Sequence, residues 1–385
     1  MARLFEERQA VRSSAITPGT IRGGVVGFEA MAANARKAVR AALGALLIAG
    51  AAVGAITLAD DSGPERDATA PAATPSATSA PPPASPSAAR SPQPHPVSLP
   101  ALAADAPAGR DFRTGRVLSR TSEYARFHVT YESDGLTISG VMNVPSGPGP
   151  FPVLILNHGY IDPGVYVNGQ GMRREQDYLA RRGYVVVHID YRNHAESDRD
   201  PNADLELRLG YVRDSINALD AMRSSDLPFA DTGRAAMIGR SMGGSVTMRA
   251  AVTHPDLFDA YVLFAPTSSD AVDNFDKWTR GRSDRRSLAA RIIAAYGSPE
   301  SNPRFWDDVS PVTFVDRVAA PILIHHGTRD DTCSIEWSER TAAALEAAGK
   351  DVQLLRYDDG HAFGPAFPES MRRTVDFLDR HVKTG

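Results

Sequence analysis

Three residues with the chemistry of a nucleophile, an acid and a base lie in this order along the chain: Ser241, Asp330 and His361. The serine is the centre of a G-x-S-x-G pattern over residues 239–243, which follows an apolar run and precedes a helix-like segment. A serine on a tight turn between a buried strand and a helix has a strained backbone that exposes its hydroxyl group. Gly239 and Gly243 leave the room that such a turn requires. The pattern predicts an activated serine nucleophile at position 241.

The acid and the base are predicted from their positions after two apolar runs. Asp330 lies in a turn after the strand-like run 321–325, and His361 lies in a loop after the run 352–357. An activated serine needs a base within hydrogen-bond reach and an acid that orients this base, and open α/β sheets build their sites where strands end. We therefore expect Asp330 to orient His361. The adjacent Asp331 is an alternative acid.

The remaining site residues are predicted directly after the serine and at the ends of the third and fourth strands. The main-chain amide of Met242 and either the amide or the phenol of Tyr160 are expected to stabilise the oxyanion, which needs donors fixed before the reaction. We interpret His158 as a scaffold residue. The loop 190–197 either lines the site or is a solvated loop.

Strand-like and helix-like segments alternate from about residue 111 onward, which is typical of a mainly parallel sheet covered on both faces. The predicted strands are 126–132, 136–144, 152–157, 184–190, 235–239, 260–264, 321–325 and 352–357, and the predicted helices include 205–224, 242–253, 336–348 and 370–382. The first two strands are expected to form an antiparallel hairpin at the sheet edge. Residues 266–309, which contain Trp278, Tyr296 and Trp306, are expected to form a small helical lid over the site.

The N-terminal part has a different composition. Residues 1–40 are basic near their end, residues 41–59 are uncharged and long enough to span a bilayer, and residues 60–109 are rich in Pro, Ala, Ser and Thr. A start at Met1 favours an uncleaved transmembrane anchor at 41–59, and a start at Met31 favours a secretory signal. Both alternatives place a disordered linker at 60–109 and a catalytic domain at 110–385 outside the cytoplasm.

Composition excludes several other functions. The net charge of −4 over 385 residues gives no reason to expect nucleic acid as a partner. The single cysteine, Cys333, permits neither an internal disulfide nor a cysteine-based metal site, and we interpret it as a packing residue. No metal and no organic cofactor are needed for the predicted serine chemistry.

The stretch from about residue 133 to the C-terminus resembles the catalytic domain of the prolyl-oligopeptidase family of serine peptidases. The shared patterns are Asp-Gly at 134–135, Ile-x-Gly at 138–140, His-Gly at 158–159, Gly-x-Ser-x-Gly-Gly at 239–244, Ser-Pro at 310–311, His-Gly-Thr-x-Asp-Asp at 326–331 and Gly-His-x-Phe at 360–363. The resemblance implies an α/β-hydrolase fold with a mostly parallel eight-stranded sheet. It also implies Ser241 as nucleophile, Asp330 and His361 as its partners, and Tyr160 with Met242 at the oxyanion site.

The sequence differs from the family where substrates would bind. The Pro-rich segment stands where members with a β-propeller would need several hundred residues, Met242 replaces an aromatic residue, and Cys333-Ser334 replaces Val-Pro. We expect a serine hydrolase that acts through an acyl-enzyme, cleaving small peptides or amides. The alternatives are a carboxylesterase of the dienelactone-hydrolase or acyl-esterase type and a non-catalytic envelope binding protein.

Overall fold

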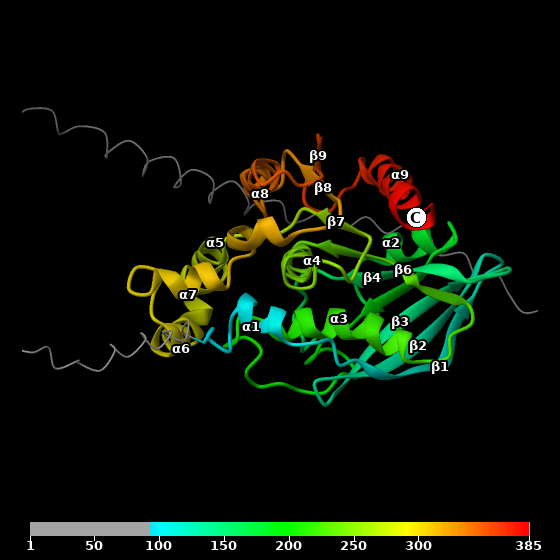
Figure 1. Ribbon diagram of the computed structural model, residues 1–385, viewed down its shortest axis with the longest axis horizontal. Helices are drawn as coiled ribbons and strands as arrows, with labels where there is room; N and C mark the ends of the chain where they lie inside the picture. The colour runs from blue at the N-terminus through cyan, green and yellow to red at the C-terminus, as the bar shows by residue number, and fades with distance from the viewer. Residues whose placement is uncertain (1–92, 385) are drawn as a thin grey trace, which may run out of the picture. The chain divides into compact units, whose positions relative to one another are not determined.

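The computed structural model describes residues 93–384, which form one α/β body (Figure 1). The strands are β1 (Arg110–Arg120), β2 (Tyr124–Ser133), β3 (Leu136–Pro145), β4 (Phe151–Asn157), β5 (Val185–Ile189), β6 (Ala230–Arg240), β7 (Ala260–Phe264), β8 (Ile322–Gly327) and β9 (Val352–Tyr357). The α-helices are α1 (Leu99–Ala104), α2 (Arg173–Ala180), α3 (Leu209–Arg223), α4 (Met242–Thr253), α5 (Ala271–Phe275), α6 (Arg286–Tyr296), α7 (Pro303–Asp308), α8 (Ile335–Ala347) and α9 (Phe367–Leu378). Shorter turns of helix are η1 (Asp276–Arg280), η2 (Ser283–Arg285), η3 (Pro311–Arg317) and η4 (Asp379–Lys383).

The strands make one sheet in the order β1-β2-β3-β5-β4-β6-β7-β8-β9. Strands β1, β2 and β3 pair antiparallel, and β3 is antiparallel to β5. All pairs in the rest of the order, β5-β4-β6-β7-β8-β9, are parallel. The predicted fold class is therefore confirmed. The predicted antiparallel hairpin is present as β2 and β3, but its predicted place at the sheet edge is wrong, because β1 lies outside it. Asp134 and Gly135 connect β2 to β3 with positive φ angles of 51° and 77°, as a tight two-residue hairpin turn requires.

The sheet has nine strands where the sequence predicted eight. The additional strand is β1, in which only Phe112 is buried. Because β1 is an edge strand with almost no buried side chains, it lacks the alternation of apolar and polar residues that reveals a half-buried strand. Its ladder with β2 also contains three register shifts.

Helices cover both faces of the sheet, because successive residues of a strand point to opposite sides. In β4, Val153 and Ile155 belong to the core beneath α1, α3, α4 and α8, whereas Leu154 and Leu156 belong to the core beneath α2 and α9. Figure 1 shows α1, α3 and α4 together on one side of the sheet and α2 and α9 on the other.

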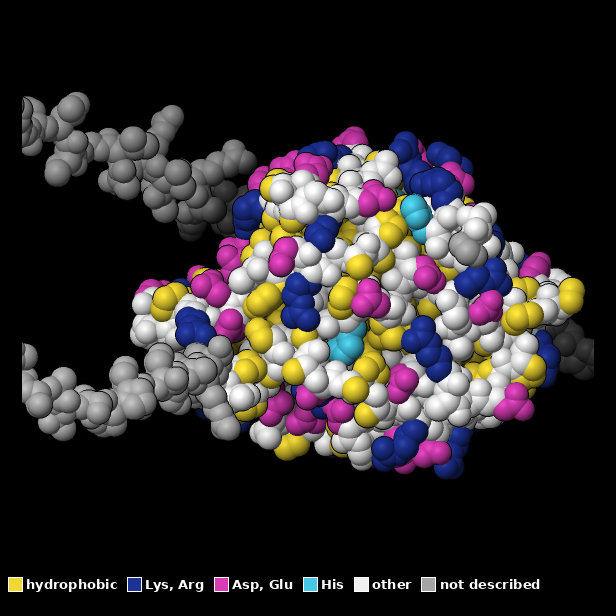
Figure 2. Space-filling model, viewed as in Figure 1, with side chains coloured by type: hydrophobic (Ala, Val, Ile, Leu, Met, Phe, Trp, Pro, Cys, Tyr) yellow, Lys and Arg dark blue, Asp and Glu magenta, His cyan; other side chains and the backbone are white. Residues whose placement is uncertain are grey.

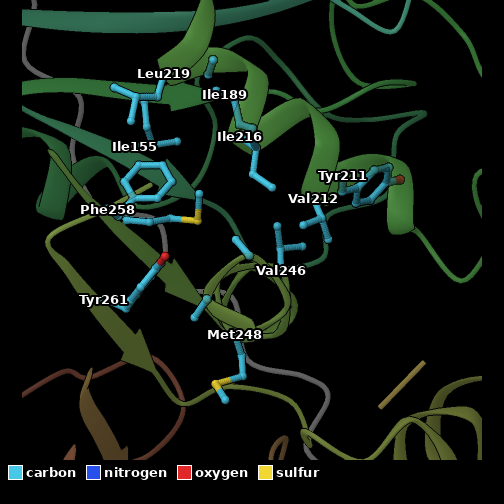
Figure 3. Packing of buried hydrophobic residues seen from close by; sticks show 14 of the residues in the cluster. Ile155, Ile189, Tyr211, Val212, Ile216, Leu219, Val246, Met248, Phe258 and Tyr261 are labelled. Carbon is cyan, nitrogen blue, oxygen red and sulfur yellow. The ribbon is translucent and has the colours of Figure 1, made fainter. Parts of the chain in front are cut away.

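The first of these cores contains side chains from both the sheet and the helices. In Figure 3, Ile155 of β4 lies beside Leu219 of α3, and Tyr261 of β7 and Ile216 of α3 belong to the same cluster. All four side chains are at most 2% exposed. This packing fixes α3 and α4 on the sheet, and α4 begins directly after Ser241.

The structure differs from the predicted linker at its C-terminal end. Residues 99–104 form α1, whose first turn is capped by the Ser98 hydroxyl accepting a hydrogen bond from the Ala101 amide. Leu99 and Leu102 are 0% and 2% exposed and pack into the core with α4. Two apolar residues in a Pro-rich and Ala-rich stretch are a weak composition signal, but on the helix they share a buried face. The folded body therefore begins before residue 109.

The predictions for residues 1–40 and 41–59, and for the linker up to residue 92, lie outside the described residues. Within residues 93–384, no helix combines the length and the apolar character that a membrane crossing requires. On the face shown in Figure 2, basic and acidic side chains are interspersed with apolar ones.

Candidate active site

Ser241 occupies the turn between β6 and α4, with φ of 56° and ψ of −121°. A residue with a side chain rarely adopts a positive φ, so this is a strained position of the kind found at functional sites. The Ser241 amide donates to the carbonyl of Phe264 at 2.9 Å, which ties the turn to the end of β7. A Cβ at Gly239 would lie 2.1 Å from the Gly243 carbonyl oxygen, and a Cβ at Gly243 would lie 2.0 Å from the Asn157 carbonyl oxygen. Both predicted glycines are therefore required by the close packing of this turn.

Asp330 and His361 lie after β8 and β9 and are joined by a hydrogen bond. Nδ1 of His361 is 2.7 Å from Oδ2 of Asp330, and the carboxylate is completely buried. Oδ1 of Asp330 accepts from the amides of Thr332 and Cys333, each at 2.9 Å. The predicted acid is thus the one that contacts the predicted base, whereas the Asp331 carboxylate accepts only from the Thr332 hydroxyl.

The environment of Asp330 keeps its carboxyl group ionised. Burial raises the pKa of Asp330, but hydrogen bonds from His326, His361 and the Cys333 amide outweigh burial and hold the pKa well below its usual range. An ionised acceptor requires Nδ1 of His361 to carry the proton. Nε2 is then the unprotonated nitrogen, which can accept a proton from a serine hydroxyl.

Ser241 and His361 line the same cavity, whose volume is about 530 Å³. No hydrogen bond joins the two side chains within residues 93–384, and Oγ of Ser241 lies 3.9 Å from Sγ of Cys333. Hydrogen bonds between catalytic groups are often long in ligand-free enzymes and shorten when substrate binds. Burial raises the pKa of the Cys333 thiol to about 12, so this sulfur is protonated and does not compete as a nucleophile at neutral pH.

The residues predicted for the oxyanion site are next to the serine. A Cβ at Gly159 would lie 3.2 Å from Cβ of Ser241, so the 159–160 turn after β4 contacts Ser241. Met242 is the first residue of α4, and within the described chain neither its amide nor that of Tyr160 donates to another protein group. The Tyr160 side chain is 46% exposed, and its hydroxyl accepts from Arg285 at 3.0 Å. This arrangement favours the main-chain amide of Tyr160 over its phenol as the second donor.

His158 is a buried residue of the scaffold. It is 0% exposed, stacks on Tyr166 with ring centroids 4.7 Å apart, and packs at a tilt against Tyr191 with ring centroids 4.5 Å apart. Burial, together with a smaller contribution from nearby His194, lowers the pKa of His158 to about 3, so the ring is neutral. None of the residues that line the cavity comes from the loop 190–197. Asp190 instead accepts hydrogen bonds from Ser139, Tyr166, Asn168 and the Gly169 amide.

Helices from the predicted lid segment lie over the cavity, which is lined by residues of α5, η1, η2 and α6 and by Trp306 of α7. Trp278 and Trp306 both line it. Tyr296 does not, and instead stacks on Phe305 with ring centroids 4.4 Å apart. The lid segment has its own small core, which includes Phe275, Ile292 and Phe305.

Sequence reasoning did not assign a role to three residues that support the triad positions. His326 is buried, and its Nε2 lies 3.3 Å from Oδ2 of Asp330. Arg240 forms a buried ion pair with Glu175 and donates to the carbonyl oxygen of His361 at 3.1 Å. Arg240 is adjacent to the nucleophile in sequence, but the sequence does not reveal its partner 65 residues away.

A strained serine between a parallel strand and a helix, with a carboxylate and a histidine after the next strands of the same sheet, defines an α/β-hydrolase. The site contains the groups that a serine hydrolase requires. The chain belongs to the prolyl oligopeptidase family, whose pattern matches residues 170–385, more than half of the sequence. The predicted resemblance is therefore confirmed.

Relatives are named as both peptidases and esterases. The chain is 29% identical to the uncharacterized peptidase YuxL of Bacillus subtilis over 58% of this chain and 33% of that protein. It is 25% identical to the uncharacterized peptidase YtmA of the same organism over 68% of this chain and 95% of that protein. It is also 28% identical to the esterase LipC of Mycobacterium tuberculosis over 56% of this chain and 53% of that protein.

The fold is also similar to that of solved structures. An acylaminoacyl peptidase of Pyrococcus horikoshii aligns with a TM-score of 0.54 and 21% identity, over 69% of this chain and 43% of that chain. The chain thus spans a third of YuxL and less than half of this peptidase. The family membership and the similarity to proteins named as peptidases and esterases favour an enzyme over the alternative of a non-catalytic binding protein.

Proposed function

We propose that the protein hydrolyses small peptides or amides through an acyl-enzyme formed on Ser241. The observation that carries this proposal is the buried, ionised Asp330 bound to Nδ1 of His361, in a cavity that also contains the strained Ser241. Oγ of Ser241 attacks the substrate carbonyl carbon while Nε2 of His361 takes the hydroxyl proton. The oxyanion receives hydrogen bonds from the amides of Met242 and Tyr160.

The leaving group departs with the proton that His361 has taken, and the acyl group remains on Ser241. A water molecule then attacks the ester carbon and gives a proton to Nε2 of His361, which returns it to Oγ as the acyl group leaves. Throughout this cycle Asp330 holds the imidazole in one orientation and stabilises its charged form.

A carboxylesterase is the second candidate. It is favoured by the apolar lid side chains Phe275, Leu288, Ile292 and Trp306 that line the cavity, and by the similarity to an esterase. Amide cleavage demands protonation of a poor leaving group, so it is the more stringent test of the two activities.

The experiment compares aminoacyl p-nitroanilides with short-chain p-nitrophenyl esters on the purified protein, beside Ser241→Ala. We expect Ser241→Ala to lose at least about a thousandfold in kcat on every substrate while its melting temperature is retained. Near-normal turnover by this variant would exclude Ser241 as the nucleophile. Ester turnover without measurable amide turnover would replace the peptidase proposal by the carboxylesterase.

We also propose that the catalytic domain works outside the cytoplasm, either anchored through residues 41–59 or secreted. The support is the uncharged run 41–59 with basic residues before it and acidic residues after it. If the domain is anchored, protease treatment of intact cells that express the full chain should degrade it. If it is secreted, the domain should be present in the medium. A domain that resists digestion until the cells are lysed would contradict this location.

A further inference from the structure

The active-site cavity follows one side of α4 away from the nucleophile. Ser241, Met242, Ser245, Val246 and Arg249 all line it. Residues four apart on a helix share a face, so 241, 245 and 249 form one row. Eight residues at a rise of 1.5 Å place the α-carbons of Ser241 and Arg249 roughly 12 Å apart. A substrate acylating Ser241 can therefore extend along α4 towards Arg249.

Arg249 is a buried cation without a carboxylate partner. Only 8% of the residue is exposed, and Nη1 donates to the carbonyl oxygen of Leu207 at 2.9 Å. Its Nε is buried without a hydrogen-bond partner. Within residues 93–384, no Asp or Glu forms an ion pair with this guanidinium, although a charge removed from water usually has a counterion. Burial, together with a smaller contribution from the nearby charge of Arg208, lowers the pKa of Arg249 to about 10, so Arg249 remains charged at neutral pH.

The other arginines that line the cavity have carboxylate partners. Arg208 lies 2.7 Å from Asp204, and Arg282 lies 2.9 Å from Asp284. Arg285 is 3.9 Å from the second oxygen of Asp204. Among the described arginines that line the cavity, Arg249 is thus the one that forms no ion pair with a carboxylate.

A second unpartnered donor lines the same cavity. Nε1 of Trp278, on η1 of the lid segment, is buried and has no hydrogen-bond partner. An indole N–H can only donate, as can a guanidinium. Two unpartnered donors from separate elements therefore favour a ligand group that accepts hydrogen bonds and carries negative charge.

We propose that Arg249, assisted by Trp278, binds a carboxylate of the substrate at a distance from the scissile bond. The enzyme then prefers esters or amides that carry this remote carboxylate over neutral substrates of the same length. This inference rests on the proposed function, because it takes Ser241 as the reacting group. The carboxylate belongs either to the acyl group or to the leaving group.

The test uses pairs of substrates that differ only in the remote charge. The acyl arm compares p-nitrophenyl hydrogen suberate with p-nitrophenyl octanoate, and the leaving-group arm compares 4-carboxyphenyl octanoate with phenyl octanoate. A charge-assisted hydrogen bond predicts a kcat/KM about 10-fold to 100-fold higher for the charged member of one pair, and the pair that shows it identifies the source. Arg249→Gln should remove most of this preference and leave the rate on the neutral ester within about threefold.

Arg282→Gln is the matched control, because it removes a positive charge from the same cavity but from a guanidinium that is paired with Asp284. It should leave the preference unchanged. Arg249→Lys keeps the charge and should retain part of the preference. Equal rates on both members of both pairs in the wild-type enzyme would overturn the proposal, as would a preference that survives in Arg249→Gln.

A binding measurement separates this proposal from failure of folding and from failure of the proposed function. In Ser241→Ala, the suberate dianion should raise the melting temperature while 1,8-octanediol does not, and adding Arg249→Gln should abolish the effect. An equal response to the diol and the dianion would reject the carboxylate site. Persistent turnover by Ser241→Ala would reject the nucleophile assignment and leave this binding result intact.

Discussion

The buried ion pair between Glu175 of α2 and Arg240 of β6 links the nucleophile turn to the histidine loop. Arg240 immediately precedes Ser241, and its Nη1 donates to the carbonyl oxygen of His361 at 3.1 Å. Nη2 of Arg240 pairs with Glu175, and the two side chains are 13% and 2% exposed. We therefore expect Glu175→Gln to affect both stability and turnover.

The magnitude follows from the burial of the pair. Removing one partner of a buried ion pair costs about 3–5 kcal/mol, because the remaining charge has no counterion. The low end applies here, since the amide of Gln still accepts a hydrogen bond and the Arg240 guanidinium lies 5.1 and 5.2 Å from the ring centroids of Phe264 and Phe363. In a domain of this size, each kcal/mol of lost unfolding free energy lowers the melting temperature by about 2 °C, so a loss of about 3 kcal/mol lowers it by about 6 °C.

Turnover should fall because Arg240 holds the loop that carries the base. A displaced imidazole reduces kcat about tenfold or more and changes KM less, because the chemical step depends most on alignment. Calorimetry and ester hydrolysis at saturating substrate measure the two effects.

Glu369→Gln is the control, since Glu369 forms an exposed pair with Arg373 on α9 at 2.8 Å and should change the unfolding free energy by less than about 1 kcal/mol. Equal melting temperatures for Glu175→Gln and the wild type would refute the stability reasoning. A lower melting temperature with unchanged kcat would refute the positioning role.

Three further predictions concern the oxyanion site, the first helix and acid stability. Tyr160→Phe should keep kcat within about threefold of the wild-type value, because the phenol oxygen already accepts a hydrogen bond from Arg285 and is not expected to bind the oxyanion. Loss of a true oxyanion donor costs about 100-fold or more in kcat. A loss of that size in steady-state assays would therefore assign the phenol as the donor instead of the amide. Leu102→Ala should lower the unfolding free energy by about 2–3 kcal/mol in urea titrations, and no loss would place α1 outside the folded body. The unfolding free energy should fall as the pH drops from 6.5 towards 4. Burial lowers the pKa of His158 and His325 to about 3 in the folded protein, whereas in the unfolded chain these histidines take up protons near the ordinary pKa of 6.5. Equal unfolding free energies at pH 7 and pH 4.5 in urea titrations would contradict this.

The sequence predicted the parts of the fold whose signals are local. Apolar runs followed by turns identified the parallel strands, and the ends of these strands identified the positions of Ser241, Asp330 and His361. Helix α4 begins and ends where it was predicted, at 242 and 253. Strand β1 and helix α1 were missed because one is exposed on nearly all its length and the other buries only two leucines.

The supporting contacts could not be predicted, because each joins segments that are distant in sequence. Glu175 and Arg240 are 65 residues apart, and nothing in the composition of either segment distinguishes a buried ion pair from two solvated charges. The choice between Asp330 and Asp331 also required the structure, since two adjacent carboxylates in a turn have equal local signals and differ in which one points to His361.

Three arginines with little exposure illustrate how a charge in the scaffold differs from a charge available to a ligand. Arg192 is 6% exposed and bonds Asp214 through Nε and Nη2, and Arg240 has Glu175. Each is neutralised within the fold and so can hold a loop without attracting an anion. Arg249 is equally buried but bonds a main-chain carbonyl oxygen instead of a carboxylate. Its position at the cavity wall means that the counterion its burial requires can come from the substrate.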